Sequence, residues 1–138
     1  MAITQTTCPS FKVELLTGTH NFSSDTFKIA LYTGAATLNA DTTVYTTSNE
    51  VSATGYTAGG NTLTVSTTPT SSGTIAYVSF SNTSWSSALT ARGALIYNSS
   101  KSNKAVAVLD FGADKTSTST FTVTFPAADA TSAIVRIS

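Results

Sequence analysis

The sequence predicts an all-β protein, an antiparallel β-sandwich of the jelly-roll or immunoglobulin-like type with one short N-terminal helix. Three observations predict this class. Apolar residues recur mainly with a period of two, which is the spacing of a strand with one buried face. Ser and Thr make up about a third of the 138 residues, and β-branched Thr suits an exposed sheet surface. Many short segments alternate with turn residues, as in sandwiches.

The one expected helix lies near the N-terminus, between Cys8 and Gly18. Pro9 can open its first turn, and Gly18 can end its last turn. Phe11 and Leu15 are four residues apart, so they would share one face of the helix. Because two turns are too few to be stable alone, we expect this helix to pack against the sheets.

Beyond the helix, seven segments carry the strand pattern. The clearest has Phe121, Val123 and Phe125 on one face with threonines between them. Two nearly continuous apolar runs, at 92–98 and 104–111, are typical of central strands, and the polar residues between them predict a hairpin. The expected strands are 27–33, 61–66, 74–80, 92–98, 104–111, 119–125 and 133–137, with a further short strand at 43–46 and turns at 69–73 and 112–116.

The length predicts a single β-sandwich domain over residues 1–138. Residues 1–7 are polar except for Ile3, and we interpret them as an extended arm that a partner orders. The long loop at 35–60 contains Tyr45 and Tyr56, and aromatic residues are favoured interface anchors. The predicted interface residues are therefore Ile3, Tyr45 and Tyr56.

The charge balance excludes several classes of function. Seven basic and seven acidic residues give a net charge of zero, and only 10% of residues are charged. Too few cations are present to neutralise many phosphates, so we expect neither nucleic-acid binding nor polybasic membrane binding. No apolar run approaches the roughly 18 residues of a membrane-spanning helix. The N-terminal residues lack the basic and apolar regions of a secretion signal, which predicts synthesis in the cytoplasm.

No chemical site is evident in the sequence, and we predict no catalytic residue, metal or cofactor. A lone Cys8 can form neither an intramolecular disulfide nor a thiolate zinc site. His20 is the only imidazole, and without a nucleophile motif we expect it to be structural. Asp110 and Asp114 flank one predicted turn, but two carboxylates fall short of the about six to eight oxygens that Ca²⁺ takes.

Trp85 is the only tryptophan, and it has two interpretations. An exposed indole ring could form a platform for a sugar. A single large aromatic residue in a β-domain more often lies in the core, because such residues dominate core packing.

Several segments of this chain resemble small virion structural proteins of tailed bacteriophages, a family with capsid decoration and cement proteins. The resemblance is carried by 10–20, 27–33, 55–60 and 91–98, and it extends to 125–131 and 134–137. It implies a homo-oligomer, a dimer or trimer, that binds the major capsid protein on the capsid surface after synthesis in the host cytoplasm. The family has no catalytic motif, so no residue roles transfer.

The sparse charge agrees with this expectation, because few ionic groups need to be desolvated when a lattice assembles. Two other functions stay open. One is a tail-fibre or receptor-binding module that contacts host glycan through Trp85 or the loop at 55–60. The other is an enzyme such as a glycan hydrolase, which would need paired carboxylates across a cleft.

Overall fold

The protein is described by a computed structural model that covers residues 2–138, and it is built mostly of strands. The described residues form ten strands, one α-helix and one 3-10 helix. In chain order these are β1 (Thr6–Thr7), α1 (Pro9–Leu16), β2 (Phe27–Tyr32), β3 (Asn61–Thr62), β4 (Val65–Ser72), β5 (Ile75–Phe80), β6 (Thr83–Trp85), β7 (Thr90–Asn98), η1 (Ser99–Lys101), β8 (Lys104–Thr116), β9 (Phe121–Val123) and β10 (Val135–Ile137). The predicted all-β class with one short N-terminal helix is confirmed.

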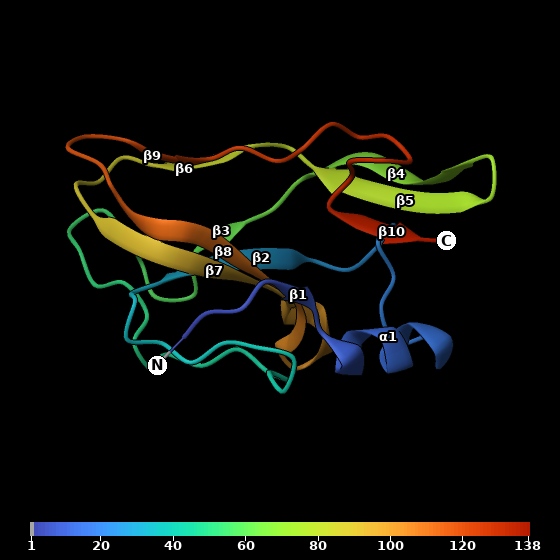
Figure 1. Cartoon of the computed structure of the whole chain (residues 1–138), viewed down its shortest axis with the longest axis horizontal. Coiled ribbons are helices and arrows are strands. Elements are labelled where there is room, and N and C mark those ends of the chain that lie inside the picture. Colours follow the sequence, from blue (N-terminus) through green and yellow to red (C-terminus); the bar gives the residue numbers. More distant parts are fainter. Residues whose placement is uncertain (1) are drawn as a thin grey trace.

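The strands form two layers. One layer is a five-stranded sheet of order β1-β8-β7-β2-β3, and the other contains the sheets β10-β5-β4 and β6-β9. Figure 1 shows the second layer above the five-stranded sheet, with α1 on the other side. Aromatic rings join the layers: the ring centroids of Phe27 and Phe80 are 5.9 Å apart, and those of Phe111 and Phe121 are 6.1 Å apart.

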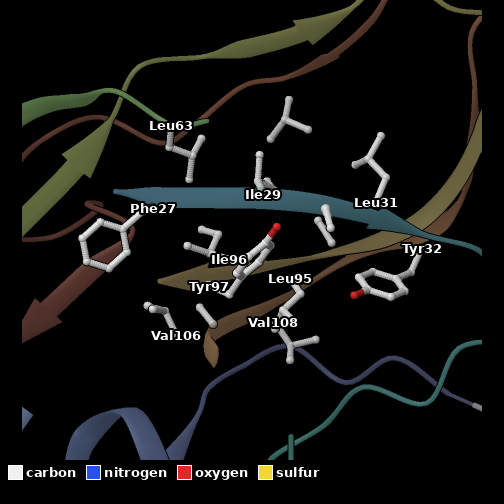
Figure 2. Packing of buried hydrophobic residues seen from close by; sticks show 14 of the residues in the cluster. Phe27, Ile29, Leu31, Tyr32, Leu63, Leu95, Ile96, Tyr97, Val106 and Val108 are labelled. Atoms are coloured by element: carbon white, nitrogen blue, oxygen red, sulfur yellow. The ribbon is translucent and has the colours of Figure 1, made fainter. Parts of the chain in front are cut away.

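The centre of the large sheet is buried on both faces. Ile29 lies opposite Ile96, and Ala30 lies opposite Leu95 in the β2–β7 pairing; all four side chains are fully buried. Figure 2 shows Ile29 on one side of β2 and Tyr32 on the other. The nearly continuous apolar runs at 92–98 and 104–111 follow from this arrangement, because a strand covered on both faces needs no polar face.

The helix α1 forms as the sequence predicts. Pro9 occupies its first turn, where a missing N–H costs nothing. Gly18 has a φ of +76°, and its N–H donates to the carbonyl of Leu15. Phe11 is fully buried, while Leu15 is partly buried against the same core. The helix is therefore held by the one face that carries these two residues.

The turns predicted at 69–73 and 112–116 are wrong, because both segments lie mostly or wholly within strands. β4 extends through Pro69 to Ser72, and the edge position of β4 tolerates a proline because the outer N–H groups have no strand to pair with. β8 extends through Gly112 to Thr116, which lies opposite Thr90. A bulge between Ala91 and Gly93 absorbs the turn-like residues of β8. The segment 43–46 forms only an isolated bridge between Val44 and Lys104.

The described part of the predicted N-terminal arm is ordered by this chain itself, contrary to the expectation that a partner orders it. Thr6 pairs with Val108 in β8, and Ile3 bridges Leu38 and is buried. A Cβ at Gly93 would lie 2.9 Å from the side chain of Ile3. The bare backbone of Gly93 thus leaves the space that Ile3 fills. Met1, which belongs to the predicted arm, lies outside the described residues.

Two glycines with positive φ provide a matched test of this packing. A Cβ at Gly60 would overlap the backbone carbonyl of Ile29 in β2, whereas one at Gly73 would meet no atom within 4 Å. We expect Gly60→Ala to lower the free energy of unfolding by more than about 2 kcal/mol. Gly73→Ala should cost about 1 kcal/mol, from the left-handed backbone alone. Urea unfolding measures both, and equal losses would contradict the close approach of residue 60 to β2.

Candidate functional site

His20 lies at the centre of a closed polar network. The Nε2 atom of His20 is 2.9 Å from Oε1 of Glu14, and its Nδ1 atom is 3.0 Å from Nδ2 of Asn98. Oδ1 of Asn98 accepts from the N–H of Ser100, so Nδ2 is the atom that faces His20 and Asp25. Nδ2 can only donate, and Nδ1 of His20 therefore accepts. The imidazole proton is on Nε2, from which it is donated to Glu14.

The network ties three parts of the chain together and leaves no nitrogen of His20 for chemistry. The side chain of His20 is fully buried, and its ring lies 4.9 Å from the ring of Phe11. Burial opposes ionisation of Asp25, but hydrogen bonds from Asn98 and Asn21 and the charge of Lys101 together hold the pKa of its carboxyl below its usual value. This geometry is that of a structural clamp between α1, the segment before β2 and the β7–β8 hairpin.

A second network, the Glu50 cluster, consists of Glu50, Tyr32, Tyr45, Tyr56, Gly59 and Tyr97. Glu50 accepts three hydrogen bonds: from the hydroxyl of Tyr45 at 2.6 Å, from the hydroxyl of Tyr56 at 2.7 Å and from the N–H of Gly59 at 2.8 Å. The hydroxyl of Tyr56 also accepts from the N–H of Leu31 in β2. The carboxylate thus fastens the long segment between β2 and β3 to the edge of the large sheet.

The remaining members of the Glu50 cluster hold the same segment over the sheet face. The rings of Tyr45 and Tyr97 stack with centroids 4.6 Å apart. The hydroxyl of Tyr97 donates to the carbonyl of Gly59, and that of Tyr32 donates to the carbonyl of Thr46. Burial and the charge of Glu50 raise the pKa of Tyr97 to about 12. The same two causes raise the pKa of Tyr32 still further above its ordinary value.

The predicted interface and sugar-binding residues lie mostly in the core. Tyr56 and Trp85 are only 9% and 4% exposed, and Ile3 is buried as described above. The indole ring of Trp85 packs 5.9 Å from Tyr56 and 6.3 Å from Phe121. Trp85 therefore has no free face for a sugar, and neither Ile3 nor Tyr56 presents its side chain to a partner. Tyr45 is half-buried and is engaged with Glu50.

Four large apolar side chains of the described residues are exposed: Val44, which precedes Tyr45 in the long segment, and three others on α1 and β10. Leu16 is 90% exposed, Val13 is 61% exposed and Ile137 is 53% exposed. Leu16 and Ile137 face a groove of about 480 Å³ between α1 and β10. This α1–β10 groove is lined by Thr7, Phe11, Lys12, Leu15, Leu16 and residues 135–138. Figure 1 places α1 and β10 at the same end of the molecule, on the right, with β10 in the upper layer and α1 below.

A second hollow of about 520 Å³ adjoins the groove, between the β10-β5-β4 sheet and the end of α1 with the segment that follows it. It shares Leu15, Val135 and Ile137 with the α1–β10 groove and adds Phe22 and Val78. Its surface is mostly apolar, and none of the described residues that line either hollow is an Asp or a Glu. The two hollows therefore adjoin at Leu15, Val135 and Ile137, and together they form an apolar surface suited to binding apolar side chains.

Other side chains offer little for catalysis. Burial raises the pKa of the Cys8 thiol to about 11, so the thiol is protonated and a poor nucleophile near neutral pH. Asp110 is paired with Arg92 at 3.2 Å. Within residues 2–138, no three His, Cys, Asp or Glu side chains come together as metal ligands. No helix in that same part of the chain is long and apolar enough to span a membrane.

Sequence reasoning missed both the Glu50 cluster and the α1–β10 groove. Glu50 carries no local motif, and its partners come from 32 to 97 along the chain. Leu16 follows Leu15 directly, so only the docking of α1 decides which of the two leucines is exposed.

Comparison with protein-family models, curated proteins and solved structures found no match to this chain. The resemblance to phage virion proteins therefore stays a prediction.

The Glu50 cluster predicts a large effect from one carboxylate. We expect Glu50→Ala to lower the free energy of unfolding by about 3 kcal/mol, because it leaves two tyrosine hydroxyls and one N–H without their acceptor. Asp114→Ala is the matched control, since Asp114 is exposed, and its cost should stay within about 0.5 kcal/mol. Urea unfolding of both variants is the measurement. Similar small losses would show that Glu50 does not hold the segment.

The raised pKa values of the tyrosines also predict how stability depends on pH. In the unfolded chain a tyrosine ionises near pH 10, whereas Tyr97 in the folded protein ionises near pH 12. Its contribution to stability is complete below about pH 10 and is lost as the pH rises from there through about 12. Unfolding curves of the wild type and Tyr97→Phe between these pH values should show a shallower decline for the variant. An unchanged decline in the free energy of unfolding would argue against a raised pKa of Tyr97.

Proposed function

We propose that the protein is a structural protein of a bacteriophage particle, most simply a capsid decoration or cement protein that binds the major capsid protein on the capsid surface. The observation that carries the proposal is the α1–β10 groove with its exposed Leu16 and Ile137. Two exposed apolar side chains beside one groove are a candidate contact for another protein. Its shape and its apolar lining suit protein contacts more than chemistry.

The polar clusters support a binding role over an enzymatic one. His20 has both ring nitrogens in hydrogen bonds, and Glu50 already accepts three. Neither group can take a proton from a substrate without breaking the contacts that hold covering segments in place. Paired carboxylates facing each other across a cleft, which a glycan hydrolase needs, do not line either hollow beside β10.

The phage part of the proposal rests on the sequence resemblance, and the composition supports it. A chain with 10% charged residues and a net charge of zero loses little solvation when it packs against a lattice. Repeated weak sites gain strength on a lattice through multivalency, so one shallow groove for each copy suffices. The alternative of a glycan-binding tail module loses its main support because Trp85 is buried.

The copy number in particles tests this proposal. Purified phage particles that carry the gene for this chain are digested, and the chain is counted against the major capsid protein by quantitative mass spectrometry. We expect a fixed ratio set by the capsid lattice. A ratio typical of a few tail fibres would favour the receptor-binding alternative, and absence from particles would refute a virion role.

A further inference from the structure

We propose that the α1–β10 groove binds an extended protein segment in which apolar side chains alternate with acidic ones. Under the proposed function, this segment belongs to the capsid protein rather than to a second copy of this chain. Only this choice of partner rests on the proposed function. The chemistry of the segment follows from the apolar surface of the groove, its charged rim and the open edge of β10.

The apolar part of the groove supplies the anchoring sites. Phe11 is fully buried at its base, and Leu16 and Ile137 stand exposed at its sides. The adjoining hollow adds Phe22 and Val78. A partner side chain such as leucine or isoleucine would remove apolar surface from water on both sides of the contact. The two hollows share Leu15, Val135 and Ile137, so successive anchors can enter adjoining parts of one apolar surface.

The charged rim decides which polar residues the partner carries. Lys12 and Arg136 both line the groove, and both are exposed. The ion pairs of the described residues involve His20, Arg92, Lys101 and Lys104 on the basic side. The lining side chains therefore carry two cations and no carboxylate. Acidic residues beside the apolar anchors would complement this rim.

The edge of β10 favours an extended conformation for the bound segment. β10 pairs with β5 on one side, and it is the last strand of its sheet among the described residues. β10 is three residues long, and Arg136 is its middle residue. A segment lying along this edge can form main-chain hydrogen bonds to β10, while its alternate side chains enter the apolar hollows. Strand addition of this kind combines backbone affinity with side-chain specificity.

A second copy of this chain fits the groove poorly. A twofold interface brings the same patch of both copies together, so it would gather two copies each of Lys12 and Arg136 in one interface whose lining side chains include no carboxylate. An anionic membrane also fits poorly, because two cations on a chain with no net charge give little attraction to lipid headgroups. The experiment also tests these two alternatives, binding of a second copy and binding of an anionic membrane.

The experiment uses two labelled synthetic peptides and the whole chain. One hexapeptide alternates leucine and aspartate, and the other has lysine in place of aspartate. Fluorescence anisotropy should show the aspartate peptide binding at least about tenfold more tightly, with weaker binding at about 0.5 M salt. The double variant Lys12→Glu/Arg136→Glu should reverse the preference between the peptides. Leu16→Asp should reduce binding of the aspartate peptide.

Matched controls separate the groove from general electrostatics and from unfolding. Lys115→Glu makes the same charge change at an exposed residue of β8 outside the groove, and it should leave the preference for the aspartate peptide intact. Circular dichroism of each variant checks that it is folded, which we expect because Lys12, Leu16 and Arg136 are all exposed.

Three results would overturn the inference. The first is equal binding of the two peptides by the wild type. The second is a dimer, measured by light scattering, that Leu16→Asp dissociates, because a second copy would then occupy the groove. The third is binding to vesicles of anionic lipid that Lys12→Glu abolishes while neither peptide binds.

The inference and the proposed function can fail separately. If the chain is present in particles at the lattice ratio but the aspartate peptide does not bind, only the inference fails. If the peptide binds in the groove but the chain is absent from particles, only the virion role fails.

Discussion

The structure depends on one constraint: the central strands β2, β7 and β8 are apolar on both faces, so both faces must be covered. The second layer of strands covers one face, with Phe80 packed on Phe27. The other face is covered by elements with little regular structure, which include the N-terminal segment with Ile3 and the long segment between β2 and β3. A five-stranded sheet with one bare apolar face would not be stable in water.

Irregular covering segments bring their own cost, since their backbone groups need partners and their conformational entropy is lost. The two polar networks meet this need. Glu50 gathers two tyrosine hydroxyls and the N–H of Gly59 at the sheet edge, and His20 joins Glu14 of α1 to Asn98 of β7. Three of the seven carboxylates, those of Glu14, Asp25 and Glu50, thus hold segments in place. The apolar side chains left exposed include Leu16 and Ile137, which line the α1–β10 groove.

Local patterns predicted best the strands with nearly continuous apolar runs. The regularly alternating segment 119–125 forms only the three residues of β9, and 61–66 is divided between β3 and β4, which belong to different sheets. Local sequence patterns predicted the hairpin between 92–98 and 104–111. They also predicted the helix that begins at Pro9, and both elements are present. The turn prediction at Gly112 was wrong, because β8 continues to pair with β7 on both sides of a bulge. Tyr56 was predicted as an interface residue from its type, but the layers close over it. Trp85 is buried, in agreement with the core position that its residue type favours and not with the alternative sugar contact.

The amino-acid sequence by itself determined the all-β class, the approximate positions of the main strands along the chain, the position of the helix and the low content of charged residues. These features depend on periodicity and composition, which are properties of neighbouring residues. Only the tertiary structure decided which aromatic residues are buried, where the carboxylate of Glu50 lies and which apolar side chains stay exposed. Burial is a property of the whole assembly of layers. Leu15 and Leu16 are the same residue type at adjacent positions, yet one packs against the core and the other faces water.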